Sequence, residues 1–267
     1  MRKRHALKQI CKELTLLGID STTILLDLPF AEYGYHSLTK TIERGIKLHI
    51  GAVLGRFTIP LTAMVTPMNV SDHAEFDNVL QDMKPFVDLQ KVILVFDRGY
   101  WKVERFIDLT LNGIKFITRL KEGVCYRVLM KKKGGKKKKW EDMDIEFTSG
   151  EVFRLVVIRD GKEEFRYVTN TWKLTPLHVH RCYEQRWDME VLNKILKSNL
   201  AIDHFMAKNL NAMLIQIFIT LIFYLLIALF QIFHNSLLSV LEIKRLIEHC
   251  GSLPFKRMVK TYPMLAI

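Results

Sequence analysis

The chain has few of the residues that hold disulfide-stapled or zinc-binding domains together. Its 267 residues include four cysteines, Cys11, Cys125, Cys182 and Cys250, and none belongs to a Cys-x2-Cys pair or a Cys/His cluster. This pattern excludes a zinc motif and a disulfide framework and favours a reducing, intracellular compartment. Acidic residues are also in the minority, with 28 Asp and Glu against 40 Lys and Arg, so the net charge is +12. Such a charge favours a polyanionic partner, either nucleic acid or an acidic membrane surface.

Nothing in the composition indicates disorder, a repeat or a targeting segment. Hydrophobic residues make up 49% and charged residues 25% of the chain, close to the average of globular proteins. The length allows one large domain or two modest ones. The start is basic, but Lys8, Lys12 and Glu13 interrupt the residues that follow, so the apolar segment of a signal peptide does not develop. We therefore expect a cytoplasmic protein.

One uncharged stretch, residues 212–233, is long enough to span a bilayer. Its polar residues fall at spacings of four, four and seven, along one stripe of a helix: Gln216, Thr220, Tyr224 and Gln231. A stripe indicates two different neighbours, whereas a lone membrane span has lipid on all sides. We favour a core helix whose apolar face, including Phe218 and Leu225, packs on the sheet or on a neighbouring helix. A membrane anchor is the alternative.

The first 120 residues predict the alternating strands and helices of an α/β sheet. Residues 45–54 and 57–65 have the pattern of antiparallel strands, and Ser71 is a suitable N-cap for the helix that follows. Residues 91–96 form a nearly unbroken apolar run, which is typical of a strand covered on both faces. Asp97 stands at the carboxyl end of this strand.

Residues 121–169 change to short strands and turns, including the hairpin signal Asp160-Gly161, and predict a β-rich insertion. Seven lysines surround Gly134-Gly135 in this insertion: Lys131, Lys132, Lys133, Lys136, Lys137, Lys138 and Lys139. Their loop is either a solvated hairpin tip or an arm that grips phosphates. The pattern is helical after Pro176, beginning with residues 177–199. The predicted divisions are thus a first core part, the insertion and a helical second core part: 1–120, 121–169 and 170–267.

The segment around residue 190 carries an unusual polar face. Tyr183, Arg186, Glu190 and Lys197 are spaced three, four and seven apart, so on a helix they point along one side. One interpretation is a solvent-facing stripe in which Arg186 pairs with Glu190. The other is a functional face, and two further carboxylates favour it.

Asp20 and Asp97 are carboxylates at positions where a sheet builds sites. Asp20 interrupts an apolar strand, where an unpaired carboxylate is costly, and Asp97 ends a buried strand, where open α/β sheets place their ligands. Taken alone, Asp20 could close a turn with Ser21 and Asp97 could pair with Arg98. Together with Glu190, the two could instead converge on hard cations such as Mg²⁺, which prefers oxygen ligands.

These three segments resemble the motifs of DDE transposases from prokaryotic insertion sequences. Asp20-Ser-Thr and Asp97-Arg-Gly-Tyr look like the first two motifs, and Tyr183-x2-Arg186-x3-Glu190-x6-Lys197 is a complete copy of the signature that names one subgroup. Similar segments also occur at residues 45–49, 66–72 and 168–170, so the resemblance covers roughly residues 14–224. The motifs are specific as a set, whereas Asp-Arg-Gly-Tyr alone is not.

The resemblance implies an α/β protein with an RNase H-like catalytic core, a β-rich insertion between the second Asp and the Glu, and a helical C-terminus. It implies that Asp20, Asp97 and Glu190 hold two divalent ions, Mg²⁺ or Mn²⁺, for phosphodiester cleavage and strand transfer. The residues expected to contact DNA are Tyr183, Arg186, Lys197, Arg98 and the seven lysines. The expected partners are transposon ends, target DNA and a second copy of the chain, at the nucleoid and not at a membrane.

Two departures from the family pattern leave alternatives open. Family members generally carry a DNA-binding segment ahead of the first Asp, whereas 19 residues precede Asp20 here. A truncated relative that binds DNA or the full-length enzyme without completing transposition is therefore a second hypothesis. Asp27 is a rival for the first carboxylate, but a separation of seven residues puts it on the opposite face of a strand. We keep Asp20.

Overall fold

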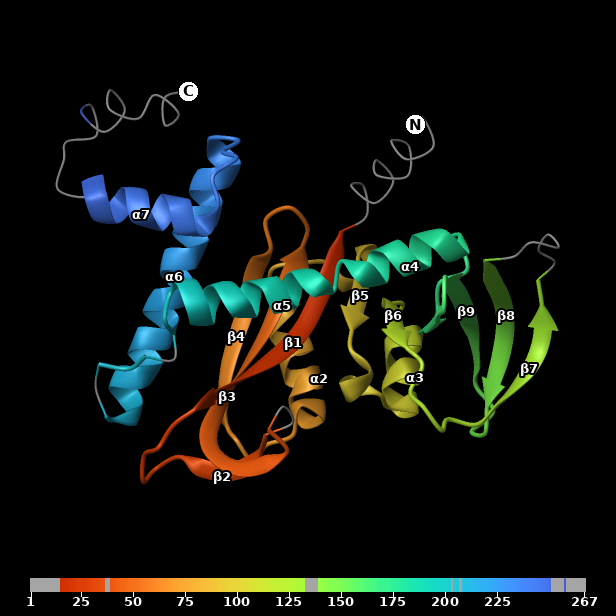
Figure 1. The fold of residues 1–267 in the computed structure, drawn as a ribbon. Coiled ribbons are helices and arrows are strands. Elements are labelled where there is room, and N and C mark those ends of the chain that lie inside the picture. The colour runs from red at the N-terminus through yellow and green to blue at the C-terminus, as the bar shows by residue number, and fades with distance from the viewer. Residues whose placement is uncertain are drawn as a thin grey trace.

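The computed structural model describes residues 15–36, 39–132, 139–202, 204–206 and 208–250, together with residue 257. These residues build one ten-stranded sheet with helices on both faces (Figure 1). The strands are β1 (Leu16–Leu25), β2 (Glu32–His36), β3 (Thr41–Leu54), β4 (Ile59–Pro67), β5 (Ile93–Phe96), β6 (Lys115–Arg119), β7 (Tyr126–Lys131), β8 (Trp140–Phe147), β9 (Val152–Asp160) and β10 (Glu163–Thr169). The longer helices are α2 (Asp72–Met83), α3 (Val103–Leu111), α4 (Pro176–Glu184), α5 (Trp187–Lys194), α6 (Leu210–Phe233) and α7 (Val240–Cys250). Short helical turns are η1 (Leu89–Lys91), η2 (Arg98–Tyr100) and η3 (Ile195–Asn199).

The centre of the sheet has the order β4-β3-β1-β5-β6. β1, β5 and β6 are parallel, and β3 is antiparallel to β1 and to β4. The two antiparallel strands predicted at residues 45–65 are thus confirmed, as is the Ser71 N-cap, whose hydroxyl accepts from the Ala74 backbone N–H. This mixed α/β core with a helical C-terminal part agrees with the predicted RNase H-like fold.

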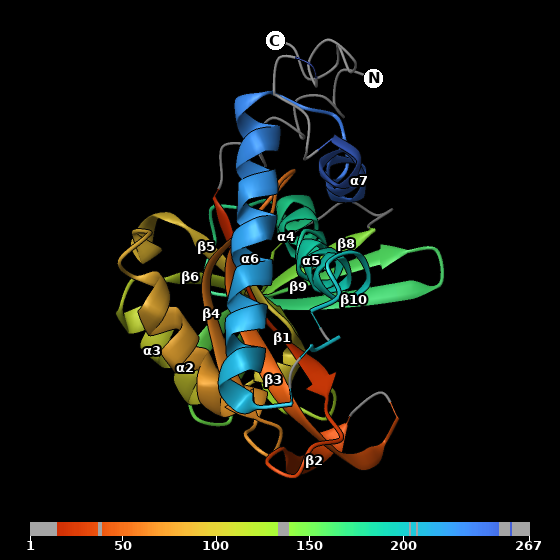
Figure 2. The same cartoon turned by 90° about the vertical axis from the view of Figure 1, so that its left-hand side faces the viewer.

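The central strands are covered on both faces, which explains their apolar sequences. In β5, Leu94 and Phe96 point into the core under α2 and α3, while Ile93 and Val95 point into the core under α4, α5 and α6. Figure 2 shows α2 and α3 on one side of the sheet and α4 and α5 on the other. The prediction from the 91–96 run is therefore confirmed.

The strands after β6 extend the same sheet in the order β6-β10-β9-β8-β7. β9 and β10 form the predicted hairpin, with Gly161 at a positive φ of 61° in the turn. A type of turn that needs positive φ favours Gly here. β7 lies at the far edge of the sheet, five strands from β5 (Figure 1).

The helix predicted over residues 177–199 is not continuous, so this expectation is wrong. α4 ends at Glu184, α5 begins at Trp187, and the chain then makes a π-helical turn, η3. α4 and α5 follow one another across the strands (Figure 1). The break allows α4 to cover β5, β6 and the later strands while α5 covers β1 and β3.

α6 packs on β4, η3 and α7 with only one of its faces. The predicted polar stripe turns toward the protein: Tyr224 donates to the Thr58 carbonyl at 2.8 Å, and Gln231 donates to the Leu238 carbonyl at 2.7 Å. Phe218, expected in the core, is 43% exposed on the other face, because the inward positions of the helix are those in phase with Tyr224. Of the described residues, α6 is the one helix long and apolar enough to cross a membrane.

Candidate functional site

The parallel pairing of β1 and β5 brings two of the predicted carboxylates to the same level. Ile19 pairs with Phe96, so the next residue on each strand is Asp20 or Asp97. Asp97 is the first residue beyond β5, and its Oδ1 accepts from the Arg98 backbone N–H at 2.7 Å. Because this bond caps η2, the carboxylate is fixed at the carboxyl end of the strand. The Arg98 side chain turns away and pairs with Glu122 at 2.9 Å.

α5 crosses directly over Asp20 because β1 carries a glycine beneath it. A Cβ placed on Gly18 would lie 2.7 Å from the Met189 Cγ and 2.8 Å from the Leu54 Cδ2. Met189 and Leu192 are buried in the core on this side of the sheet. Side chains two residues apart on a strand share a face, so Asp20 points to the same side as Gly18, toward α5. Glu190 follows Met189 directly and is the third predicted carboxylate.

Each of the three carboxylates has a different hydrogen-bond donor from the α4–α5 segment. The Tyr183 hydroxyl donates to the Asp97 Oδ1 at 3.4 Å, the Arg186 Nη2 to the Glu190 Oε1 at 2.6 Å, and the Asn193 Nδ2 to the Asp20 Oδ2 at 3.0 Å. Arg186 and Glu190 thus form the i,i+4 ion pair anticipated from the sequence, but half-buried and beside two further carboxylates.

The electrostatics of the site act on Asp20 most strongly. Burial raises the pKa of Asp20 to about 7, with the Ser21 backbone N–H and Arg186 opposing the rise and the charges of Asp97 and Glu190 adding to it. The three carboxyl groups therefore share one electrostatic neighbourhood. Burial, followed by the charge of Asp97, also raises the pKa of Tyr183 to about 12, so its hydroxyl remains a donor.

Two buried polar groups near Asp20 were not predicted from the sequence. Asn193 holds Asp20 through its amide nitrogen, while its buried Oδ1 has no hydrogen-bond partner. The Tyr100 hydroxyl is also buried without a partner, and its pKa is raised well above the ordinary value, by burial first and then by the charge of Asp20. The signal for Asn193 was its spacing, three residues after Glu190 and four before Lys197, which puts it on the same helix face.

The donor set fits a hard divalent cation in chemistry, though not in its present arrangement. In the described parts of the chain, no group of three or more His, Cys, Asp or Glu side chains is arranged to hold a metal ion. The Arg186 guanidinium occupies the Glu190 carboxylate, and Asp20 and Asp97 have their own donors. Three carboxylates and the unpartnered Asn193 Oδ1 are nevertheless oxygen ligands of the kind that Mg²⁺ and Mn²⁺ prefer. Binding an ion would require Arg186 to release Glu190.

The predicted DNA-contacting residues fall into two separate places. Lys197 lies beside the carboxylates, where its Nζ donates to the Thr23 carbonyl of β1 at 2.5 Å, because the π turn of η3 carries it back to the strand. Lys131, Lys132 and Lys139 lie at the β7–β8 end of the sheet, far from β1 in strand order. Lys132 is near Asp142 and Asp144, at 3.7 and 3.8 Å. The other predicted lysines lie outside the described residues: Lys133, Lys136, Lys137 and Lys138.

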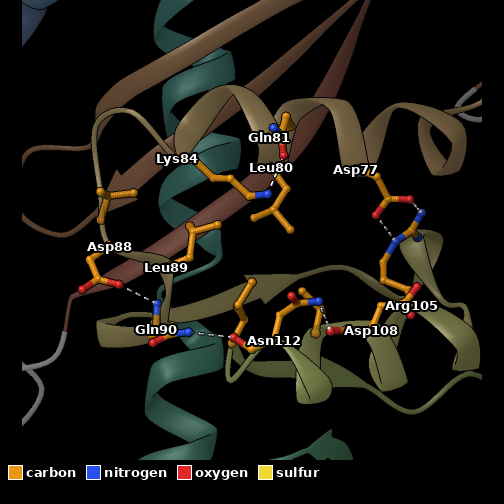
Figure 3. A pocket seen from close by; sticks show the side chains of 13 residues that line it. Asp77, Leu80, Gln81, Lys84, Asp88, Leu89, Gln90, Arg105, Asp108 and Asn112 are labelled. Atoms are coloured by element: carbon orange, nitrogen blue, oxygen red, sulfur yellow. Dashed lines mark hydrogen bonds and ion pairs between the residues drawn. The ribbon is translucent and has the colours of Figure 1, made fainter.

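A cavity of about 470 Å³ lies on the opposite side of the sheet, between α2 and α3. Figure 3 shows Asp77 and Arg105 facing each other in it, with the Arg105 Nη2 3.1 Å from the Asp77 Oδ2. None of the predicted site residues lines this cavity. The carboxylate site is therefore an open surface at the strand ends, which suits a large substrate better than an enclosed small molecule.

Comparisons with known proteins give one consistent result. A family model described as "Transposase DDE domain" matches residues 12–226. A protein named as a transposase for insertion sequence element IS4SA, from Synechocystis sp., is 26% identical over 244 residues, covering 87% of this chain and 64% of its own length. A second, named as a transposase for insertion sequence element IS5377, from Geobacillus stearothermophilus, is 27% identical over 225 residues, covering 78% and 55%. The chain thus spans about three-fifths of the length of these relatives.

Proposed function

The chain belongs to the transposase DDE domain family, and on that premise we propose that it is the catalytic part of a DNA transposase of an insertion sequence. The reaction is the cleavage of phosphodiester bonds at transposon ends and the transfer of a strand to target DNA. The observation that supports it is the position of Asp20 and Asp97 side by side at the ends of parallel strands, under the helix that carries Glu190. We also propose a cytoplasmic, nucleoid-associated location.

In this proposal Asp20, Asp97 and Glu190 are the ligands of two divalent ions, Mg²⁺ or Mn²⁺. When bound, the ions supply the activation of a water or a 3′-hydroxyl and the stabilisation of the leaving oxygen. Asn193 orients the Asp20 carboxylate through its 3.0 Å hydrogen bond. Residues that orient metal ligands typically affect metal affinity about 10- to 100-fold.

The side chains that now cover the carboxylates are the proposed phosphate-binding groups. Arg186 provides a guanidinium fork that suits a phosphate as well as it suits Glu190, so arrival of DNA and metal would move it from one to the other. Tyr183 stays a hydroxyl donor at neutral pH, and Lys197 adds a positive charge on the same face. Arg98 and the lysines of the β7–β8 loop extend the basic surface away from the reacting bond.

The experiment is cleavage of a plasmid that carries the two inverted repeats flanking the gene, with Mg²⁺ supplied. Wild type and the control Asp27→Asn, an exposed carboxylate beyond β1, should cleave equally. Asp97→Asn should lose cleavage while it keeps its thermal midpoint and its binding to non-specific DNA. Full activity in Asp97→Asn would refute the assignment. A wild type that binds DNA but never cleaves it would favour the truncated, regulatory relative instead.

A further inference from the structure

The outer face of α6 carries a regular apolar seam. Six large side chains on this face are between 45% and 78% exposed: Ile215, Ile219, Ile222, Leu226, Leu229 and Phe233. Their spacings are four, three, four, three and four. In Figure 2, α6 runs along the side of the molecule nearest the viewer, and no described helix or strand lies in front of it. We refer to these six residues as the α6 seam.

This alternation of three and four is the heptad repeat by which one helix packs along another. Ile219, Leu226 and Phe233 occupy one heptad position, and Ile215, Ile222 and Leu229 occupy the other. A helix that only covers a sheet needs a single apolar stripe. α6 already has that stripe on its inner face, including Ile217, Leu221 and Ala228. The seam is a second stripe, and its period indicates a second helix.

The seam is large enough for a stable interface. The exposed parts of these side chains, with the flanking Phe218 and Ile232, amount to about 900 Å², which matches the surface of about 800 Å² per partner in a standard interface. A monomer rarely exposes an apolar patch beyond roughly 300 to 600 Å². A bilayer would suit the composition, but α6 is fixed on β4 and by the bond from Tyr224 to Thr58, and it would lose these contacts in a span.

We propose that the partner is a second copy of this chain, joined seam to seam about a two-fold axis. The charges favour self-association: the chain carries +12, yet α6 contains no charged residue from Leu210 to Phe233. The positions that flank the seam and usually select a partner by charge are also uncharged, among them Phe223, Leu225 and Phe230. Apolar Ile and Leu rows complement themselves, as a two-fold interface requires. This inference deepens the proposed function, since it supplies the surface for the dimer of the active complex.

The experiment is sedimentation equilibrium of the full chain without DNA and with EDTA. Wild type should be a dimer at about 10 µM. Ile222→Glu and Leu226→Glu place a charge in the seam at positions exposed in the single copy, and each should weaken dimerisation at least about 100-fold. The matched control is Leu111→Glu, an equally apolar residue, 80% exposed on α3, which should stay dimeric.

Thermal midpoints show whether each variant is folded, and Leu226→Gln, which adds no charge, repeats the test if a Glu variant unfolds. A wild type that stays monomeric up to about 100 µM, or seam variants that dimerise as tightly as wild type, would overturn the proposal. Binding of the monomer to phosphatidylcholine vesicles, lost in Leu226→Glu, would overturn it in favour of a membrane surface. Metal-dependent cleavage is measured separately, so a failure of the seam and a failure of the proposed chemistry are distinguishable.

Discussion

The Asp20 carboxylate should destabilise the protein it serves, and the effect should appear only as the pH rises. Burial raises its pKa from 3.8 to about 7 in the folded chain. Between these values the folded state holds a proton that the unfolded state has released, so stability falls as pH rises through this window. The difference is about three pH units, and at about 1.4 kcal/mol per unit the penalty above pH 7 is at most about 4 kcal/mol.

Asp20→Asn removes the charge and keeps the shape and the acceptor oxygen for Asn193. Chemical denaturation with EDTA should give equal free energies of unfolding for wild type and variant near pH 4. By pH 8 the variant should be the more stable, by up to about 4 kcal/mol. The control Asp27→Asn, at an exposed carboxylate, should stay within about 0.5 kcal/mol of wild type. A stability difference for Asp20→Asn that does not change with pH would refute the burial argument.

Three further perturbations test the surroundings of the carboxylates. Gly18→Ala should cost about 1 to 3 kcal/mol by overpacking and lower cleavage by shifting α5; a denaturant midpoint equal to that of wild type would contradict the contact with Met189. Asn193→Ala should weaken Mn²⁺ binding about 10- to 100-fold, with partial recovery in Asn193→Gln, whereas unchanged affinity would leave Asn193 a packing residue. Gln at the seven lysines should flatten the salt dependence of DNA binding by about 0.9 in log–log slope per lost phosphate contact, and an unchanged slope would show that the loop does not bind DNA. The replaced lysines are Lys131, Lys132, Lys133, Lys136, Lys137, Lys138 and Lys139.

The sequence predicted the parts of the site that depend on local pattern. The apolar run before Asp97 identified a buried strand, and a carboxylate at its end marks where such sheets place ligands. The hairpin at Asp160-Gly161 and the cap at Ser71 also follow from local backbone chemistry. Local signals of this kind do not depend on what the segment later packs against.

The parts that the sequence did not reveal depend on tertiary packing. The break between α4 and α5 has no Gly or Pro to announce it, and the π turn that brings Lys197 to Thr23 leaves no clear pattern. The pairing of Asn193 with Asp20 joins residues 173 positions apart. For α6, polarity alone suggested which side would face outward, but the fold uses Tyr224 and Gln231 on the inside and leaves the apolar seam outside.

The central claim is that Asp20, Asp97 and Glu190 form one site for divalent ions. The most direct test is Mn²⁺ binding followed by electron paramagnetic resonance, which requires neither DNA nor activity. Wild type and Asp27→Asn should bind Mn²⁺ alike, and Asp20→Asn, Asp97→Asn and Glu190→Gln should each lower the affinity at least about tenfold. Equal binding by all five proteins, or no binding by wild type, would contradict the claim.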